Sequence, residues 1–178
     1  MTVMSGSEGL DRGALEARLR EFDRAVVLLY PGRSFRLILV GGGALVLLGC
    51  LTRATADLDA LEVPATLIDL AARYDISYRV AAYLDHFALN LEDRLVQLSI
   101  GTTAVICCAA SLEDVVAAKL CSGRDTDEAD VRRPEVLAQL DWARLDVVAT
   151  EVEGSLMSEQ RRSQFLYNLR RFTEEYRP

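Results

Sequence analysis

The chain has 178 residues, a length that suits a single domain and is sufficient to bury a hydrophobic core. Its composition, 51% hydrophobic and 26% charged residues, is that of a globular protein and excludes a disordered or collagen-like chain. A formal net charge of −7 argues against broad electrostatic affinity for nucleic acid, which depends on many lysines and arginines.

The first third of the chain predicts a helix, a buried strand and a second, shorter helix. Apolar residues recur at three- and four-residue steps over 10–29, which indicates an amphipathic helix. The run 35–40 is apolar and rich in branched residues, so it predicts a buried strand. The glycines at 41–43 predict a tight turn, and the alanine and leucines of 44–51 favour a short helix.

The middle of the chain predicts further strands. Residues 57–63 alternate along their length and predict a second strand. Residues 65–74 have helical spacing, whereas the pattern from there to His86 indicates no single structure. The alternating run 94–100 and the apolar run 103–108 predict a hairpin that adds strands to the sheet.

The second half of the chain predicts helices. Ser111, with an acid three residues later, resembles a helix N-cap, and Gly123 marks the end of that helix. Further helices are expected after Pro134 and over 141–153 and 158–176. The last helix carries several arginines, which indicate either a solvated face or a local binding patch: Arg161, Arg162, Arg170, Arg171 and Arg177.

These elements predict an α+β (mixed α/β) fold. We expect a mixed sheet flanked by helices over residues 1–140, including the N-terminal helix, and a C-terminal helical extension over 141–178 that packs on it. The longest apolar stretch, 37–51, is shorter than the about 20 residues that span a bilayer. The N-terminus lacks the layout of a secretory signal, so we expect a cytoplasmic protein without a membrane segment.

Asp57 and Asp59 are the most informative residues of the sequence. Residues two apart on a strand point to the same face, about 6.5 to 7 Å apart along it. Two like charges there are destabilising unless a cation lies between them, and hard divalent cations such as Mg²⁺ take oxygen ligands. The pair therefore indicates a magnesium site, although a lone Asp-Leu-Asp is often only an exposed edge or turn.

A phosphate-binding turn is predicted ahead of this pair. Gly41, Gly42 and Gly43 follow a buried strand, so their backbone N–H groups can approach a phosphate, with a tight bend as the alternative. Arg53 is placed to contact phosphate oxygens, and Thr55 to hydrogen-bond within the loop that presents the aspartates. Together these parts would align a nucleoside triphosphate for attack at phosphorus.

Two parts of the chain resemble the polymerase-beta-like nucleotidyltransferase superfamily. Gly-Gly-Gly-Ala-Leu at 41–45 and Arg-Ala-Thr-Ala-Asp-Leu-Asp at 53–59 are similar to its glycine pair followed by Asp-x-Asp on the next strand. Ser-Leu-Glu-Asp-Val-Val-Ala-Ala-Lys-Leu at 111–120 and Arg-Asp-Thr-Asp-Glu-Ala-Asp-Val at 124–131 resemble the helix and loop of a minimal bacterial branch that includes abortive-infection toxins.

The resemblance implies transfer of a nucleotide from ATP or another nucleoside triphosphate, with Mg²⁺ as cofactor. It implies that Asp57 and Asp59 bind the metal, and that Gly42 and Gly43 contact the triphosphate. Lys119 would neutralise phosphate charge and completes the implied catalytic set.

A basic and acidic cluster lies beside the active site in that branch. Arg124 and Asp127 therefore join the expected nucleotide-binding residues, by ordering Lys119 toward the site. The alternative is a surface salt-bridge cluster, which we favour for Asp125 and Asp130. Lys119 also has an alternative interpretation, because a lysine in the last turn of a helix favours the helix dipole without any ligand.

Other notable side chains are expected to be structural. His86 is followed by apolar residues, so a packing or surface role is the simpler interpretation. Trp142 is expected to anchor the core. Cys107 and Cys108 lie in an apolar run and are expected to be buried thiols. A zinc site is disfavoured because the chain has no CxxC pair and a single histidine.

Three functional hypotheses follow. The first is an enzyme that moves a nucleotide onto an RNA or protein acceptor, for instance as the toxin of a toxin–antitoxin pair. Superfamily members usually add a third carboxylate from a later strand, but Glu92 and Asp93 fall in an expected loop and 94–100 contains no acid. The second hypothesis is therefore a degenerate binding module, such as an antitoxin or nucleotide sensor, and the third is a structural protein without a site.

Overall fold

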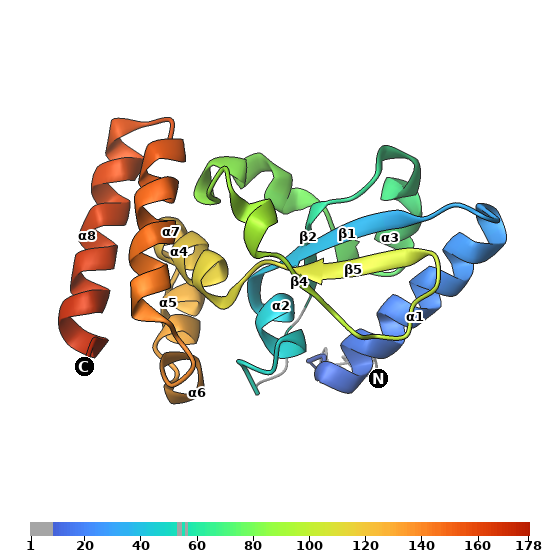
Figure 1. Ribbon diagram of the computed structural model, residues 1–178, viewed down its shortest axis with the longest axis horizontal. Helices are drawn as coiled ribbons and strands as arrows, with labels where there is room; N and C mark the ends of the chain where they lie inside the picture. The colour runs from blue at the N-terminus through green and yellow to red at the C-terminus, as the bar shows by residue number, and fades with distance from the viewer. Residues whose placement is uncertain (1–8, 53–54, 56) are drawn as a thin grey trace, which may run out of the picture.

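The chain forms a mixed five-stranded sheet with helices around it and a helical second half. This computed structural model describes residues 9–52, 55 and 57–178. Figure 1 shows the sheet with α1 and α3 toward one end of the molecule, and α4 to α8 gathered at the other. The expected α+β (mixed α/β) fold class is confirmed.

The five strands lie in the order β3-β2-β1-β5-β4. The central strand β1 (Phe35–Val40) runs parallel to β5 (Val105–Ala109) and antiparallel to β2 (Leu58–Glu62). The short strand β3 (Ile76–Ser77) pairs in parallel with β2. The short strand β4 (Val96–Gln97) pairs with β5 in the antiparallel hairpin that the sequence predicts.

The helices take up most of the rest of the described chain. Three short 3₁₀ segments lie between β2 and β4: η1 (Ala65–Leu67), η2 (Arg79–His86) and η3 (Leu91–Arg94). The α-helices are α1 (Arg12–Leu29), α2 (Gly41–Leu47), α3 (Ile68–Arg73), α4 (Leu112–Ser122), α5 (Asp125–Val131), α6 (Pro134–Leu137), α7 (Trp142–Ser155) and α8 (Glu159–Tyr176). Within the described residues, no helix is both long and apolar enough to cross a bilayer.

The expectation for the segment after β1 was wrong in one respect. The glycines do not form a separate turn before a helix over 44–51, because α2 begins at Gly41 and ends at Leu47. Gly41 has a φ of +68°, the left-handed region that glycine adopts without strain. The chain therefore passes from β1 into α2 at Gly41 alone, and Gly42 and Gly43 already belong to the first helical turn.

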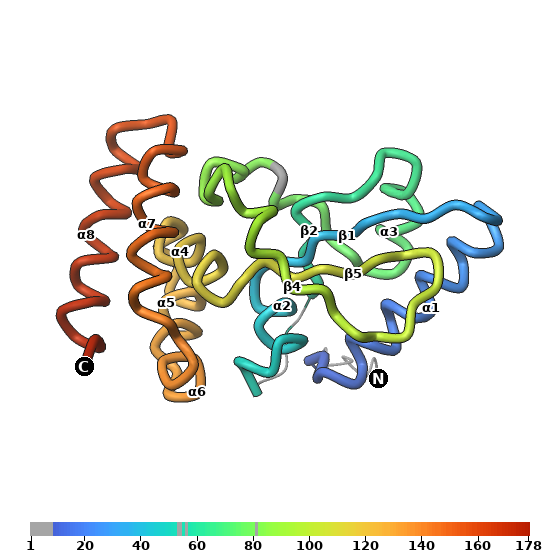
Figure 2. The backbone as a smooth tube through the Cα atoms, in the orientation of Figure 1, coloured from blue at the N-terminus to red at the C-terminus, as the bar shows by residue number. Residues whose placement is uncertain are grey.

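The helical second half is built on α4. The Ser111 side chain accepts a hydrogen bond from the Asp114 N–H, and Gly123 ends the helix with a φ of +61°, as expected from the sequence. Both α7 and α8 contact α4. The rings of Trp142 and Phe172 lie 5.5 Å apart, so the single tryptophan anchors the two C-terminal helices to each other. Figure 2 shows the backbones of α7 and α8 side by side, with α4 next to α7.

The core is continuous from α1 through the sheet to α8. Its members include Phe22, Leu39 and Phe165, none of which has exposed surface. Cys107 and Cys108 are buried, as expected. Burial raises the pKa of the Cys107 thiol to about 12, so this thiol stays protonated and unreactive at neutral pH.

A buried carboxylate joins α1 to the sheet. Asp23 accepts hydrogen bonds from the backbone N–H groups of Thr103 (2.9 Å), Ala104 (2.8 Å) and Val105 (2.8 Å). These three groups lie where the chain enters β5, so one side chain satisfies the donors of a turn that becomes buried at Ala104 and Val105. The sequence does not reveal this role, because the partners are about 80 positions away.

We expect Asp23→Ala to lower the free energy of unfolding by about 3 kcal/mol or more, because it leaves three backbone donors without their acceptor. Urea unfolding followed by circular dichroism measures the change. Glu21→Ala, on an exposed position of the same helix, is the matched control and should change stability by less than about 0.5 kcal/mol. Equal losses in the two variants would contradict the assigned role.

Candidate functional site

The three glycines bring α2 directly against the segment that leads into β2. A Cβ placed on Gly41 would stand 3.1 Å from Asp59 Oδ2, and one on Gly42 would stand 3.2 Å from Thr55 Oγ1. On Gly43 it would lie 2.9 Å from Leu58 Cδ1 and 3.3 Å from the Asp57 carbonyl oxygen. The glycine turn and the aspartate pair, separate in sequence, are therefore neighbours in the fold.

Asp57 and Asp59 interact through their charges. Asp59 lies on β2, pairs with Val40 of β1 and is partly buried, whereas Asp57 is exposed immediately before the strand. Burial raises the pKa of Asp59, and the negative charge of Asp57 raises it further. A hydrogen bond from Ser77 and the positive charges of Arg124 and Lys119 act in the opposite direction on this pKa.

The loop before Asp57 is held by Thr55. Its hydroxyl donates to the Asp57 carbonyl oxygen (3.3 Å). Its backbone forms a two-way bridge with Leu10: the Leu10 N–H donates to the Thr55 carbonyl (2.6 Å), and the Thr55 N–H donates to the Leu10 carbonyl (3.0 Å). Arg53, which we expected to contact phosphate, lies outside the described residues.

Lys119 is buried among carboxylates rather than exposed at the end of α4. It is 7% exposed, and its Nζ forms ion pairs with Asp127 (2.5 Å) and Asp130 (3.0 Å) of α5. Burial acts to raise the pKa of Asp127, but Lys119 and the hydrogen bonds from Ser122 and Arg124 outweigh it and hold this pKa below its usual range. A role confined to the helix dipole does not account for this burial.

The surface interpretation of Asp130 was wrong, whereas Asp125 is exposed as expected. Asp130 is 2% exposed, and its Oδ2 lies 3.9 Å from the position of a Cβ on Gly42. A charged residue is buried only when it is paired, and Lys119 supplies the pairing. The sequence did indicate that Asp130 belongs with Asp127, because positions three apart share one face of a helix.

The site therefore draws on both halves of the chain. The structure brings the glycine turn and the loop before β2 together with α4 and α5. The predicted site residues that it places in this region are Gly41, Gly42, Gly43, Thr55, Asp57, Asp59, Lys119, Arg124 and Asp127. Sequence reasoning missed Ser77, Ser122 and Asp130, which hydrogen-bond or ion-pair with members of this set.

Carboxylates outnumber cations in this region. The described part of the site contains four carboxylates and two cations: Asp57, Asp59, Asp127 and Asp130, with Lys119 and Arg124. Excess negative charge around a partly buried carboxylate favours binding of a cation. The same described residues contain no group of three or more His, Cys, Asp or Glu side chains arranged to hold a metal ion. Any metal here would have two protein carboxylates and would complete its shell with other oxygens.

The 3₁₀ segment η2 borders the site. It contacts β2, α4 and α7 and occupies the green region above α4 in Figure 1. His86 of this segment is buried and its ring packs on Tyr83, as expected for a packing residue. Burial lowers the pKa of His86, with the charges of Arg161 and Arg124 adding to this effect and those of Asp85 and Asp127 opposing it.

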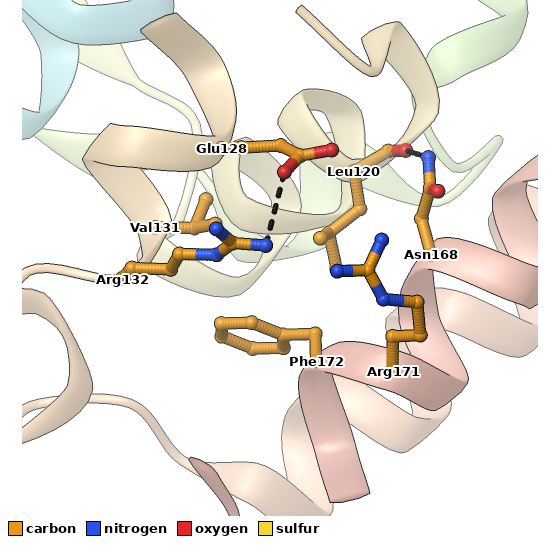
Figure 3. A pocket seen from close by; sticks show the side chains of 7 residues that line it. All are labelled: Leu120, Glu128, Val131, Arg132, Asn168, Arg171 and Phe172. Atoms are coloured by element: carbon orange, nitrogen blue, oxygen red, sulfur yellow. Dashed lines mark hydrogen bonds and ion pairs between the residues drawn. The ribbon is translucent and has the colours of Figure 1, made fainter. Parts of the chain in front are cut away.

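A small cavity lies away from this region, between α5 and α8. Figure 3 shows it between the ion pair of Arg132 with Glu128 (3.0 Å) and the hydrogen bond from the Asn168 side-chain amide to the Leu120 carbonyl (2.8 Å). Its volume of about 20 Å³ suits roughly one water molecule and no nucleotide. The arrangement around Asp59 is the candidate site because the predicted site residues meet there.

We expect Gly43→Ala to lower the free energy of unfolding by about 1–3 kcal/mol, because its Cβ has no room against Leu58 and the Asp57 carbonyl. Thermal and urea unfolding measure the change. Gly154→Ala is the matched control: a Cβ there meets no atom within 4 Å, and alanine in a helix should stabilise by up to about 1 kcal/mol. A stabilising Gly43→Ala would contradict the close approach.

The chain has one histidine, so its titration is directly observable. We expect the ring protons of His86 in NMR spectra to titrate below the ordinary pKa of about 6.5. Since the unfolded chain then binds the proton more readily than the folded one, stability should fall as the pH drops through about 6.5. The His86→Gln variant should lose this part of the pH dependence of stability. A midpoint of the His86 titration above about 6.5 would contradict the effect of burial on its pKa.

A family model matches residues 17–177 of the chain, and its description reads "Nucleotidyltransferase of unknown function (DUF6036)". The comparisons with curated proteins and with solved structures gave no match. The family description agrees with the nucleotidyltransferase that the sequence predicts, whereas the polymerase-beta-like superfamily and its abortive-infection branch stay predictions. Because the match includes the glycine turn, both aspartates, Lys119 and the C-terminal helices, the chain belongs to this family of nucleotidyltransferases of unknown function.

Proposed function

We propose that the protein transfers a nucleotide from a nucleoside triphosphate to an RNA or protein acceptor and requires Mg²⁺. The observation that carries the proposal is the meeting of the glycine turn, the aspartate pair and the buried Lys119 cluster in a chain of this family. Each feature has a simpler explanation alone. A carboxylate pair beside backbone donors and cations is, however, the arrangement that phosphoryl and nucleotidyl transfer require.

Asp57 and Asp59 are the residues that would hold the ion. The raised pKa of Asp59 reflects a carboxylate that burial and a neighbouring charge disfavour in its ionised form, and a divalent cation would reverse both effects. Magnesium commonly uses one or two carboxylates and takes its remaining ligands from water and substrate phosphates, which suits this two-acid set. When bound, the ion supplies positive charge to the triphosphate oxygens.

The other residues bind and orient the triphosphate. The first N–H groups of α2, at Gly42 and Gly43, have no partner within the helix and are available to phosphate oxygens. Lys119 has three N–H donors, and its ion pairs with Asp127 and Asp130 fix its position. Arg124 donates through Nε to Asp127, which leaves the outer nitrogens of its largely exposed side chain for a phosphate.

In the proposed step, an acceptor oxygen forms a bond to the α-phosphorus while the bond to the bridging oxygen of the β-phosphate breaks. Pyrophosphate leaves, and the proton of the acceptor hydroxyl passes to water. Lys119 and Arg124 offset the charge that develops on the phosphate oxygens, and burial of Lys119 strengthens its share. If the protein is the toxin of a toxin–antitoxin pair, the acceptor would be an RNA or protein of the cell in which the toxin acts.

A second candidate is a module that binds the triphosphate without turning it over, as an antitoxin or a nucleotide sensor. This candidate is favoured because Asp127 and Asp130 already form ion pairs with Lys119, which makes them poor general bases. Of the two acids ahead of β4, Glu92 and Asp93, the first is also engaged, because Glu92 pairs with Arg36 at 2.8 Å. A carboxylate held by a cation is a weaker proton acceptor than a free one.

The purified protein should release pyrophosphate with Mg²⁺, at least one nucleoside triphosphate and a lysate fraction of RNA or protein. Transfer of label from each α-labelled triphosphate identifies the nucleotide and the acceptor class. Asp59→Asn should reduce the rate about 100-fold or more, the loss typical of one electrostatic group in such a site. Asp69→Asn, on an exposed position of α3, is the matched control and should retain activity.

Melting temperatures, read together with pyrophosphate release, separate the two candidates. Mg²⁺ with a triphosphate should raise the melting temperature of the wild type in either case, through preferential binding to the folded state. Asp59→Asn should itself be more stable without ligand, since its ionised carboxylate is disfavoured in the folded protein at neutral pH. Binding without pyrophosphate release would favour the sensor, and neither binding nor release would contradict both.

A further inference from the structure

Tyr83 presents an aromatic ring to solvent beside the candidate site. Its side chain is 50% exposed, although the segment η2 that carries it contacts β2, α4 and α7. In Figure 1 this segment lies between the sheet and the C-terminal helices, and the charge of its Asp85 acts on Cys121 near the C-terminal end of α4. A large aromatic surface left open at such a place is available to a ligand.

The ring of Tyr83 is held by its neighbours. The His86 ring packs against it, with centroids 5.3 Å apart and planes inclined at 43°. His86 and Phe87 are buried, and Asp85 forms an ion pair with Arg161 of α8 (3.0 Å). The backbone of Tyr83 leaves the helical region (φ −123°, ψ 34°), so a kink lies at this residue. Buried neighbours on its C-terminal side thus fix the ring.

Arg124 connects this ring to the aspartate pair. It lies within electrostatic range of the Asp59 carboxylate and of the Tyr83 hydroxyl, and its Nε donates to Asp127 at 2.7 Å. The Arg124 side chain is 74% exposed, so a ligand can reach its outer edge. In a nucleoside triphosphate only the ribose separates the base from the phosphates. A surface for the base must therefore lie close to the side chains that bind the phosphates.

We propose that the exposed face of Tyr83 stacks against the base of the nucleotide whose phosphates lie at Arg124 and the aspartate pair. This inference rests on the proposed function, and it adds a base-binding surface built on η2. Stacking on an aromatic ring tolerates every base, because each base has a π-face. Tyr83 would therefore add affinity for nucleotides as a class, without selecting one base by hydrogen bonds.

Two other tyrosines with comparable exposure fit this role less well. Tyr167 lies on α8, and the guanidinium of Arg171 sits 5.7 Å from its ring centre. Tyr78 follows Ser77, whose side chain binds Asp59. Tyr78 is also less exposed than Tyr83, at 39% against 50%.

The experiment compares ligands with and without a base. Isothermal titration calorimetry measures dissociation constants for ATP, GTP, CTP, UTP and inorganic tripolyphosphate, each with Mg²⁺, on the wild type, Tyr83→Ala and Tyr83→Phe. Tyr83→Ala should weaken the best nucleoside triphosphate about tenfold or more and leave tripolyphosphate unchanged. Tyr83→Phe keeps the ring and should stay within about twofold of the wild type. Tyr167→Ala is the matched control and should bind every ligand as the wild type does.

Several outcomes would overturn the inference. Equal binding of nucleotides by Tyr83→Ala and the wild type would remove the stacking role and leave the proposed function intact. Equal weakening of nucleotide and tripolyphosphate would assign Tyr83 to the phosphates or to the fold, as would a lower melting temperature of Tyr83→Ala without ligand. A wild type that binds tripolyphosphate as tightly as any nucleotide has no base site. A wild type that binds none of the probes overturns the proposed function together with this inference.

Discussion

The contact between α2 and the chain before β2 is the constraint on which the rest of the site depends. Three consecutive residues without a Cβ let the helix begin at the end of β1 and lie against Thr55, Leu58 and Asp59. Any side chain at Gly41 or Gly43 would separate these segments. The glycines therefore have a packing role that precedes any contact with phosphate, and the same close approach places the start of α2 beside the segment that carries the aspartates.

The buried ion pairs of Lys119 join the helical second half to this contact. Burying a lysine and two aspartates is costly, and removing one partner leaves an unpaired charge inside the protein. Asp130 reaches the neighbourhood of Gly42 from α5, so the cluster bridges α4, α5 and the start of α2. Well-packed apolar residues would bridge these helices at least as stably. A charged cluster at this position is more readily understood as part of a site than as a device for stability.

Local patterns in the sequence were sufficient to predict many of the helices and strands. They were insufficient to predict contacts between residues far apart in the chain. The strand 35–40 was predicted with its observed bounds, because a branched apolar run ends at a glycine. The segment η2 was left unresolved, since 3₁₀ turns lack the 3.6-residue period that identifies a helix. The burial of Asp23 and Asp130 was missed, because acids are usually exposed and their partners lie on other elements.

Charge constrains what such a site can accept. The chain has a net charge of −7, and the described part of the site has more carboxylates than cations. A triphosphate would approach this region against repulsion unless a divalent cation accompanied it. Burial and the charge of Asp57 raise the pKa of Asp59, and the proposed Mg²⁺ would relieve the same accumulation of negative charge. The same repulsion acts on an RNA acceptor along its whole backbone. An RNA acceptor would therefore be bound through a few local contacts, and an exposed aromatic surface such as Tyr83 would add affinity for a nucleotide without adding charge.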